Sequence, residues 1–256
     1  YFYRNLRIPA GEKARQYLKK RGIGEDLARQ FFLGYALDSW DGLVRFLEKK
    51  EIDLKAAQEG GLIIKGEKGY FDRFRQRIIF PICDHLGRFV GFGGRSSVPG
   101  QPKYLNTPRT ALFNKGSTVY GLNWSKDAIK KRNQVIVVEG YTDYISLFAK
   151  GQQNVVALLG TAFSPAHAKL LRRFASNAVV AFDGDQAGEK AALRSINILS
   201  ENGMQAKIAV LDSGEDPDRF VRSRSEKEVV SWLAAAVPFM EYRINRIISQ
   251  YDLETR

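Results

Sequence analysis

Hydrophobic and polar residues follow two different patterns in the two halves of the chain. In residues 13–33, apolar side chains recur at helical spacing between charged positions, and the break at residues 21–24 predicts a turn. A second helical pattern covers residues 41–50. Across residues 62–95, short apolar runs alternate with polar positions between Gly and Pro, which predicts antiparallel strands. Residues 96–118 are rich in Pro, Gly and Asn and predict an irregular loop.

The second half shows short apolar runs separated by helical patterns of roughly ten to fifteen residues. The runs are 135–138, 155–159, 178–182 and 206–211. This alternation predicts a mostly parallel sheet with helices on its faces. Ligands of such sheets bind beyond the carboxyl ends of the strands. Residues 226–256 have a helical pattern, and we expect them to be part of a larger helical unit.

These patterns predict an α/β fold in three parts. Residues 1–132 form a basic subdomain of the α+β type, and residues 133–223 form the parallel-sheet subdomain. Residues 224–256 form a C-terminal helical segment, expected to continue beyond this sequence. The chain starts at Tyr1, so we expect it to be a fragment of a longer protein.

Composition excludes several classes of protein. Of the 256 residues, 44% are hydrophobic, enough for a packed core, and no apolar run approaches the roughly 18 residues that cross a bilayer. The single cysteine, Cys83, excludes a disulfide framework and a Cys-based zinc site, and two histidines do not replace it. We expect a cytoplasmic protein without a membrane partner and without zinc in this segment.

The net charge of +12 is unevenly distributed. Residues 1–138 hold 26 Lys and Arg against 13 Asp and Glu, whereas residues 139–256 hold 14 against 15. Aromatic and Gly residues interleave the basic ones in residues 70–75 and 89–95, a pattern that suits single-stranded nucleic acid. A solvated basic face without a specific ligand is the alternative. The three tryptophans, Trp40, Trp124 and Trp232, are interpreted as core or interface side chains.

Acidic residues gather where the predicted parallel strands end. Glu139 ends the first, Asp183 and Asp185 follow the third, and Asp216 and Asp218 lie beyond the fourth, while Asp143 lies on the helix after Glu139. One such acid is commonly a helix cap, but several together without cations raise each other's pKa values at a free-energy cost. A hard cation, Mg²⁺ or Mn²⁺, would relieve that cost and suits phosphoryl transfer. The phosphate-binding loop of P-loop ATPases is absent from the sequence.

Longer strings around these residues resemble a known family. They are Val138-Glu139-Gly140-Tyr141-Thr142-Asp143, Phe182-Asp183-Gly184-Asp185-Gln186-Ala187-Gly188, Gly214-Glu215-Asp216-Pro217-Asp218, Arg73-Phe74-Arg75-Gln76-Arg77, Gly91-Phe92-Gly93-Gly94-Arg95 and Pro102-Lys103-Tyr104-Leu105-Asn106. The acidic strings are similar to the TOPRIM motifs of primases, topoisomerases and some nucleases. Together with the basic strings they resemble the RNA polymerase domain of bacterial DnaG-type primases, over nearly the whole chain.

The resemblance implies an enzyme that synthesises short RNA primers from ribonucleoside triphosphates on single-stranded DNA during replication. Its TOPRIM subdomain would correspond to residues 133–223. The catalytic residues that it implies are Glu139, Asp183 and Asp185. The Mg²⁺ or Mn²⁺ ligands that it implies are Glu139, Asp143, Asp183, Asp185, Asp216 and Asp218.

The resemblance also implies a basic surface for nucleotide and template. Its residues are Arg21, Arg73, Arg75, Arg77, Arg95, Lys103, Tyr104, Asn106 and Lys115. The physical chemistry agrees, because Arg and Lys bind phosphates and Tyr104 can stack on a base. Family members carry an N-terminal zinc module and a C-terminal helicase-binding module, which do not fit in this chain. The implied partners are single-stranded DNA, ribonucleoside triphosphates, the RNA–DNA hybrid product and, through the absent module, the replicative helicase.

Two alternatives stay open at this point. A TOPRIM nuclease or topoisomerase-like enzyme would cleave strands, but the basic strings argue against it. A non-catalytic module that binds single-stranded DNA would need only the basic half, and it leaves the acidic residues unexplained.

Overall fold

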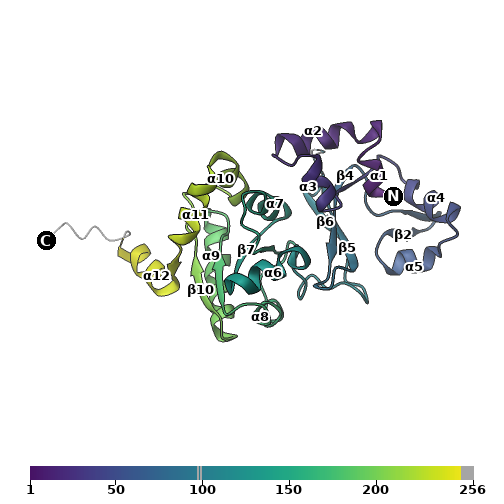
Figure 1. Cartoon of the computed structure of the whole chain (residues 1–256). Helices are drawn as coiled ribbons and strands as arrows, with labels where there is room; N and C mark the ends of the chain where they lie inside the picture. Colours follow the sequence, from purple (N-terminus) through teal and green to yellow (C-terminus); the bar gives the residue numbers. More distant parts are fainter. Residues whose placement is uncertain (97, 99, 249–256) are drawn as a thin grey trace. The chain divides into compact units, whose positions relative to one another are not determined.

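The structure is a computed structural model that describes residues 1–96, 98 and 100–248. The chain divides into two compact units, Tyr1–Thr118 and Val119–Arg256 (Figure 1). The three-part division at residues 132 and 223 stays a prediction. In the described residues, no helix combines the length and the apolar character needed to cross a membrane.

The first unit contains the predicted helices and strands. Its helices are α1 (Phe2–Asn5), a 3₁₀ helix (Pro9–Gly11), α2 (Glu12–Lys20), α3 (Glu25–Gln30), α4 (Gly42–Lys49) and α5 (Leu54–Glu59). Its strands are β1 (Gly34–Ala36), β2 (Ile63–Gly66), β3 (Gly69–Asp72), β4 (Arg77–Cys83), β5 (Phe89–Ser96) and β6 (Tyr104–Asn106). The turn at Gly22 is confirmed by its positive φ of 73°, which glycine tolerates. The prediction of an irregular loop over residues 96–118 was wrong in part, because β6 lies within it and pairs with β5.

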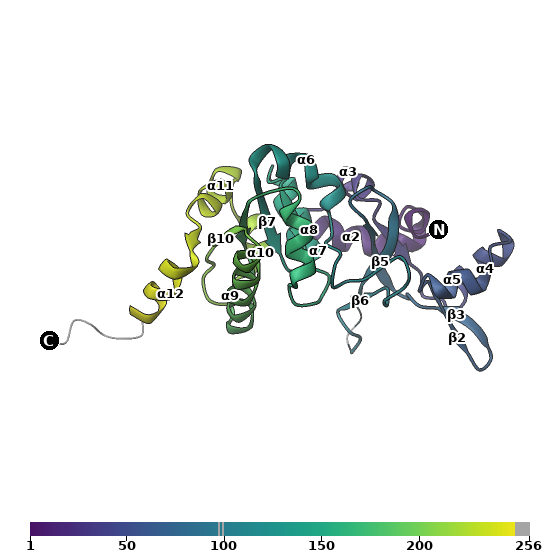
Figure 2. The same cartoon turned by 90° about the horizontal axis from the view of Figure 1, so that it is seen from below.

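An antiparallel sheet organises this unit. Its order is β1-β4-β5-β6, and every residue of β4 is buried. Gly94 on β5 allows the close packing of this sheet, since a Cβ there would lie 2.8 Å from the Phe74 ring. The β2–β3 hairpin lies beside α4 and α5 (Figure 2). The four-stranded sheet and the hairpin are therefore both packed against neighbouring segments of the first unit.

The second unit contains the predicted parallel sheet. Its helices are α6 (Leu122–Arg132), α7 (Tyr141–Ala149), α8 (Pro165–Arg172), α9 (Gln186–Glu201), α10 (Pro217–Ser223), α11 (Glu226–Ala234) and α12 (Phe239–Ile248). Its strands are β7 (Gln134–Val138), β8 (Val155–Ala157), β9 (Asn177–Val180), β10 (Gln205–Ile208) and β11 (Val237–Pro238). The order is β11-β10-β9-β7-β8, with parallel pairing from β10 to β8.

The C-terminal segment differs from the predicted continuous helix. The short strand β11 separates α11 from α12 and pairs antiparallel with β10. Pro238 lacks a backbone N–H and cannot continue α11, which favours an edge position in the sheet. Residues 249–256 of the predicted helix lie outside the described residues.

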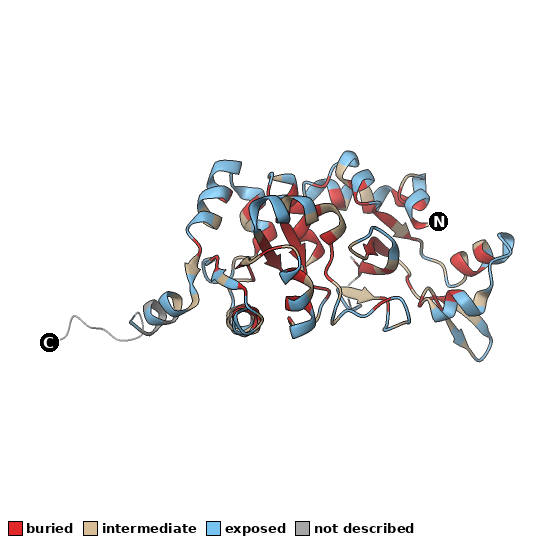
Figure 3. Cartoon of the chain, turned by 60° about the horizontal axis from the view of Figure 1, so that its bottom comes forward, coloured by how far each residue is buried: buried red, intermediate tan, exposed pale blue. Residues whose placement is uncertain are grey.

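The two faces of the parallel sheet are covered by different helices. Val135 and Val137 of β7 share one hydrophobic core with side chains of α6, α8 and α9. Side chains alternate along a strand, so Ile136 and Val138 point to the opposite face. There α7 packs against β8 and against α10. Figure 3 shows the central strands in the colour of buried residues: β7, β8 and β9 are buried almost throughout, whereas β10 and α11 are largely exposed.

Candidate functional site

Two acidic residues lie at the same edge of the parallel sheet because their strands are neighbours. Glu139 directly follows β7, and Asp183 lies three residues after the end of β9. The two strands pair in parallel, so their carboxyl ends meet at one edge. The sequence prediction that these residues come together is therefore confirmed.

Glu139 is held in an environment that disfavours its charge. Burial raises the pKa of its carboxyl group, and the negative charges of Asp183 and Asp185 raise it further. A hydrogen bond from the backbone of Asp183 partly offsets this rise. Oε1 of Glu139 is buried and has no hydrogen-bond partner among the described residues. A buried carboxylate oxygen without a partner is costly unless a cation approaches it.

Asp143 lies in the first turn of α7, close to the acidic residues that follow the strands. Its Oδ2 accepts a hydrogen bond from the backbone N–H of Gly140 at 2.9 Å. Burial raises the pKa of Asp143 well above 3.8, and the charges of Asp183, Asp218 and Asp216 raise it further. Carboxylates from the loop after β9 and from the start of α10 are thus close enough to oppose the ionisation of Asp143.

Two other predicted ligands also cap helices. Oδ1 of Asp185 accepts from the Gly188 N–H at 2.7 Å at the start of α9. Oδ1 of Asp216 accepts from the Arg219 N–H at 2.8 Å at the start of α10. These bonds fix both side chains through one oxygen each.

The glycine between the two aspartates brings two loops into contact. The Gly184 N–H donates to the Glu215 carbonyl at 2.8 Å. A Cβ on Gly184 would lie 2.2 Å from the Asp212 carbonyl oxygen, so any larger residue would push the loops apart. The Asp-Gly-Asp string thus sets the loop after β9 against the loop that leads to Asp216.

Asp218 is engaged by protein partners. It is 1% exposed, and its Oδ1 accepts hydrogen bonds from Ser146 Oγ on α7 and from Arg222 Nε at 3.1 Å. Sequence reasoning missed Ser146 and Arg222, because neither belongs to an acidic string. They hold the Asp218 carboxylate in position between α7 and α10.

No complete metal centre is formed by the described side chains. Within residues 1–96, 98 and 100–248, no three His, Cys, Asp or Glu side chains converge as a ready ligand set. The charges of Asp183 and Asp185 nevertheless raise the pKa of Glu139, and those of Asp183, Asp216 and Asp218 raise the pKa of Asp143. Their assignment as Mg²⁺ or Mn²⁺ ligands stays a prediction.

Two cavities flank the loop that carries Asp183 and Asp185. One, of 550 Å³, is lined by Glu139, both aspartates and the basic residues Lys190 and Arg194 of α9. The other, of 530 Å³, is lined by the same aspartates and by the end of β10. The first cavity is thus lined by both acidic and basic side chains, a combination that suits a phosphate group bound together with a metal cation.

In the first unit, strand pairing brings three of the predicted basic-surface residues together. Arg95 on β5 pairs with Tyr104 on β6, and Lys103 lies next to Tyr104. The Arg95 guanidinium and the Lys103 ammonium are each 5.8 Å from the centre of the Tyr104 ring. Asn106 pairs with Gly93 on the same two strands. The exposed Lys115 lies farther along the chain, in the segment before α6.

The three arginines of the string Arg73-Phe74-Arg75-Gln76-Arg77 lie in different surroundings. Arg77 is buried and donates to the carbonyls of Gly94 at 3.2 Å and Pro102 at 2.9 Å, which braces the segment carrying Lys103. Arg73 is half-buried, and its Nε has no hydrogen-bond partner among the described residues. Arg75 lies 3.9 Å over the ring of Trp40. Trp40 is 65% exposed, so it is not a core residue, and its interpretation as an interface side chain stays a prediction.

A parallel sheet with carboxylates at its strand ends is typical of Toprim domains, and residues 136–221 match the family model described as "Toprim-like". Residues 1–126 match a second model, "DNA primase catalytic core, N-terminal domain". A crystal structure of a DNA primase domain from Pseudomonas aeruginosa is 39% identical, with a TM-score of 0.90, over 99% of this chain and 81% of that one. The chain belongs to the DnaG-type DNA primase family. The predicted family and α/β fold are confirmed.

Other relatives extend this comparison. A curated DNA primase from Clostridium acetobutylicum is 44% identical over 99% of this chain and 42% of its own length. The chain therefore spans about two fifths of that relative. A solved structure of a DnaG primase catalytic domain bound to ssDNA is 34% identical, with a TM-score of 0.88, over 99% of this chain and 81% of that one.

Proposed function

We propose that this chain is the catalytic core of a DNA primase, which joins ribonucleoside triphosphates into short RNA primers on single-stranded DNA. The observation that carries the proposal is that Asp183, on the loop after β9, and Asp216 and Asp218, at the start of α10, lie close enough to the buried Asp143 to raise its pKa. A fold has no need to place three other carboxylates close enough to the buried Asp143 to oppose its ionisation. Catalysis with a divalent cation accounts for them.

The donor set fits Mg²⁺ or Mn²⁺. Every candidate ligand offers oxygen, the donor that hard divalent cations prefer, and Glu139 has a buried oxygen without a hydrogen-bond partner. The proposed ligands are Glu139, Asp143, Asp183, Asp185, Asp216 and Asp218. When bound, the cation would neutralise charge on phosphate oxygens during nucleotidyl transfer.

The remaining steps fall to side chains that position the reactants. Glu139, Asp183 and Asp185 are the proposed catalytic residues, and they line the cavity that also presents Lys190 and Arg194. In the first unit, Arg95 and Lys103 would bind phosphates of template or nucleotide, and Tyr104 would stack on a base. The bound single-stranded DNA of the related DnaG structure supports the template role. The other proposed nucleotide and template residues are Arg21, Arg73, Arg75, Arg77, Asn106 and Lys115.

The proposal extends to the whole protein. Its product would be an RNA–DNA hybrid, and a C-terminal module of the longer chain would bind the replicative helicase. Action in replication implies a cytoplasmic location. A direct assay distinguishes this function from the two alternatives, a strand-cleaving enzyme and a binding module without catalysis.

The assay combines the chain with single-stranded template, labelled ribonucleotides, Mg²⁺ or Mn²⁺, and a short RNA primer annealed to the template. We expect primer extension in the wild type and a loss of about 100-fold or more in Asp183→Ala. Asp212→Ala is the matched control, because Asp212 is an exposed carboxylate on the adjoining loop. Strand scission, or template binding without extension at high protein concentration, would contradict the proposal.

A further inference from the structure

Tyr17 on α2 contacts two arginines from different parts of the first unit. The Arg95 guanidinium carbon lies 4.4 Å from the centre of the Tyr17 ring, and that of Arg21 lies 5.6 Å from it. Both distances are within the range in which a ring face attracts a cation. Tyr17 thus joins the end of α2 to β5, and neither the family motifs nor the charge pattern singles it out.

The Arg95 guanidinium lies near two aromatic rings, those of Tyr17 and Tyr104. It is 8% exposed, and its Nε has no hydrogen-bond partner among the described residues. The Tyr17 hydroxyl is also buried without a partner among them. A buried guanidinium needs either a counter-ion or a polarisable surface that keeps it in place. Tyr17, at 4.4 Å, is closer to this guanidinium than Tyr104, at 5.8 Å.

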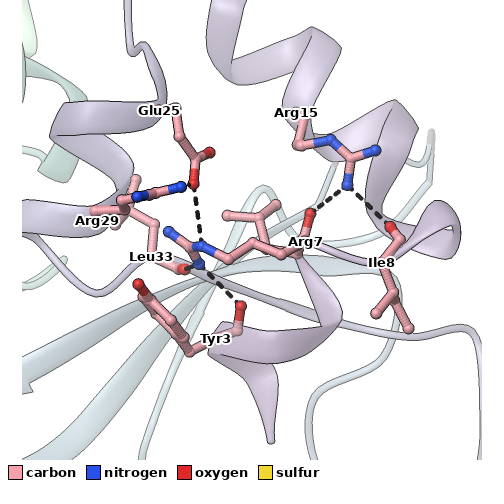
Figure 4. Close-up of polar contacts among 8 residues, drawn as sticks. Tyr3, Arg7, Ile8, Arg15, Glu25, Arg29 and Leu33 are labelled. Carbon is pink, nitrogen blue, oxygen red and sulfur yellow. Dashed lines mark hydrogen bonds and ion pairs between the residues drawn. The ribbon is translucent and has the colours of Figure 1, made fainter.

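The helix that carries Tyr17 is firmly anchored. Arg15, two residues earlier on α2, donates to the backbone carbonyls of Leu6 at 2.6 Å and Ile8 at 2.9 Å (Figure 4). Ala14 and Leu18 of the same helix are buried. The ring therefore projects from a fixed support, so it can hold a flexible arginine side chain in one orientation.

We propose that Tyr17 is a positioning residue, whose ring holds the guanidinium groups of Arg95 and Arg21 around one aromatic side chain so that both act on one stretch of nucleic-acid backbone. The inference rests on the proposed template binding by these two arginines. Both guanidinium groups lie within cation–π distance of the same ring, whose electron-rich face stabilises a nearby cation. A phosphate then finds two oriented cations in place.

The test compares Tyr17→Leu, which removes the aromatic face, with Tyr17→Phe, which removes only the hydroxyl. The readout is affinity for a fluorescently labelled oligothymidylate, measured by anisotropy on the full 256-residue chain. We expect about fivefold weaker binding for Tyr17→Leu and a change within about twofold for Tyr17→Phe. The loss should disappear in an Arg95→Ala background, because Tyr17 acts through Arg95.

Tyr3→Leu is the matched control. The Tyr3 ring also has an arginine over it, Arg7 at 3.6 Å, but Arg7 is engaged in bonds to Glu25 and to the carbonyls of Tyr3 and Leu33 (Figure 4). Loss of the Tyr3 ring in Tyr3→Leu should therefore leave oligothymidylate binding unchanged. In primer extension, Tyr17→Leu should raise the KM for template and leave kcat at saturating template unchanged.

A second readout needs no DNA. In an NMR spectrum of arginine-labelled protein, the Nε–Hε signal of Arg95 should change its chemical shift in Tyr17→Leu and report a more mobile side chain. The same signal should keep its chemical shift in Tyr17→Phe. Unchanged affinity with an unchanged Arg95 signal would overturn the inference, as would an equal loss of binding in the Arg95→Ala background. If the wild type binds no oligothymidylate while the Arg95 signal still responds, the proposed template function fails and the positioning by Tyr17 stands.

Discussion

Arg222 donates a hydrogen bond from Nε to Oδ1 of Asp218 at 3.1 Å, four residues apart on α10. The Asp218 side chain is 2% exposed, and that of Arg222 is 33% exposed. The pair therefore keeps a negative charge within the packed interface between α10 and α7. Such a charge is tolerated only while its partners remain.

Replacing Arg222 should consequently destabilise the second unit. We expect Arg222→Gln to lower the free energy of unfolding by about 1–3 kcal/mol, because a buried carboxylate loses its counter-ion. Arg219→Gln, an exposed residue on the same helix with the same change of charge, should stay within about 0.5 kcal/mol of the wild type. Urea unfolding followed by circular dichroism measures both. Equal effects of the two variants would show that the pair does not stabilise the fold.

The acidic strand ends were predictable from the sequence because they follow from local patterns. Apolar runs separated by helical patterns imply parallel strands, and the carboxyl ends of parallel strands meet at one edge. That reasoning placed Glu139 near Asp183 without any structure. It also left open how the side chains are oriented, since capping bonds such as that of Asp185 depend on loop geometry.

Contacts between distant segments were beyond sequence reasoning. The pairing of Tyr104 with Arg95 depends on the register of β6, a strand of three residues in a segment rich in Pro and Gly. Trp40 is exposed although tryptophan side chains are highly buried on average, and the Arg75 guanidinium lies over its ring. Neither fact has a periodic signal, since each arises from tertiary packing.

Asp72 provides a further contact of this kind and a second stability prediction. From the end of β3, its carboxylate accepts hydrogen bonds from the backbone N–H groups of Leu43 at 2.7 Å and Val44 at 3.1 Å, at the start of α4. Asp72→Ala would leave two buried donors unpaired, so we expect a loss of about 1–3 kcal/mol in the free energy of unfolding. Asp53→Ala removes the exposed cap of α5 and should cost about 1 kcal/mol or less. A smaller loss for Asp72→Ala than for Asp53→Ala would contradict the capping role.

Salt dependence tests the proposed role of Lys103. Each phosphate that a cation neutralises on single-stranded DNA contributes about 0.7 to the slope of log affinity against log salt concentration. We expect Lys103→Ala to reduce that slope by about 0.7, in oligothymidylate titrations between low and physiological salt. Lys227→Ala, an exposed lysine on α11, is the control for a general change in charge. An unchanged slope for Lys103→Ala would remove Lys103 from the template surface.

The raised pKa of Asp143 predicts how stability changes with pH in metal-free buffer. Burial and neighbouring carboxylates favour the protonated form of Asp143 in the folded state, so its pKa there lies well above the ordinary 3.8. As the pH rises above that ordinary value, the unfolded chain releases this proton and the folded chain retains it, which stabilises the unfolded state. The contribution of Asp143 therefore lowers stability by up to about 1.4 kcal/mol per pH unit, until the folded-state pKa is reached.

Asp143→Asn removes this contribution while its amide oxygen can still accept from the Gly140 N–H. Its free energy of unfolding should thus exceed that of the wild type by an amount that grows from about pH 4 upward, in urea titrations at successive pH values with a chelator present. The same variant should lose primer extension, because it removes a proposed ligand. Asp212→Asn, which removes an exposed carboxylate from the same unit, should stay within about 0.5 kcal/mol of the wild type throughout. A difference between Asp143→Asn and wild type that shrinks as the pH rises would mean that Asp143 is stabilised as a charged group in the folded chain.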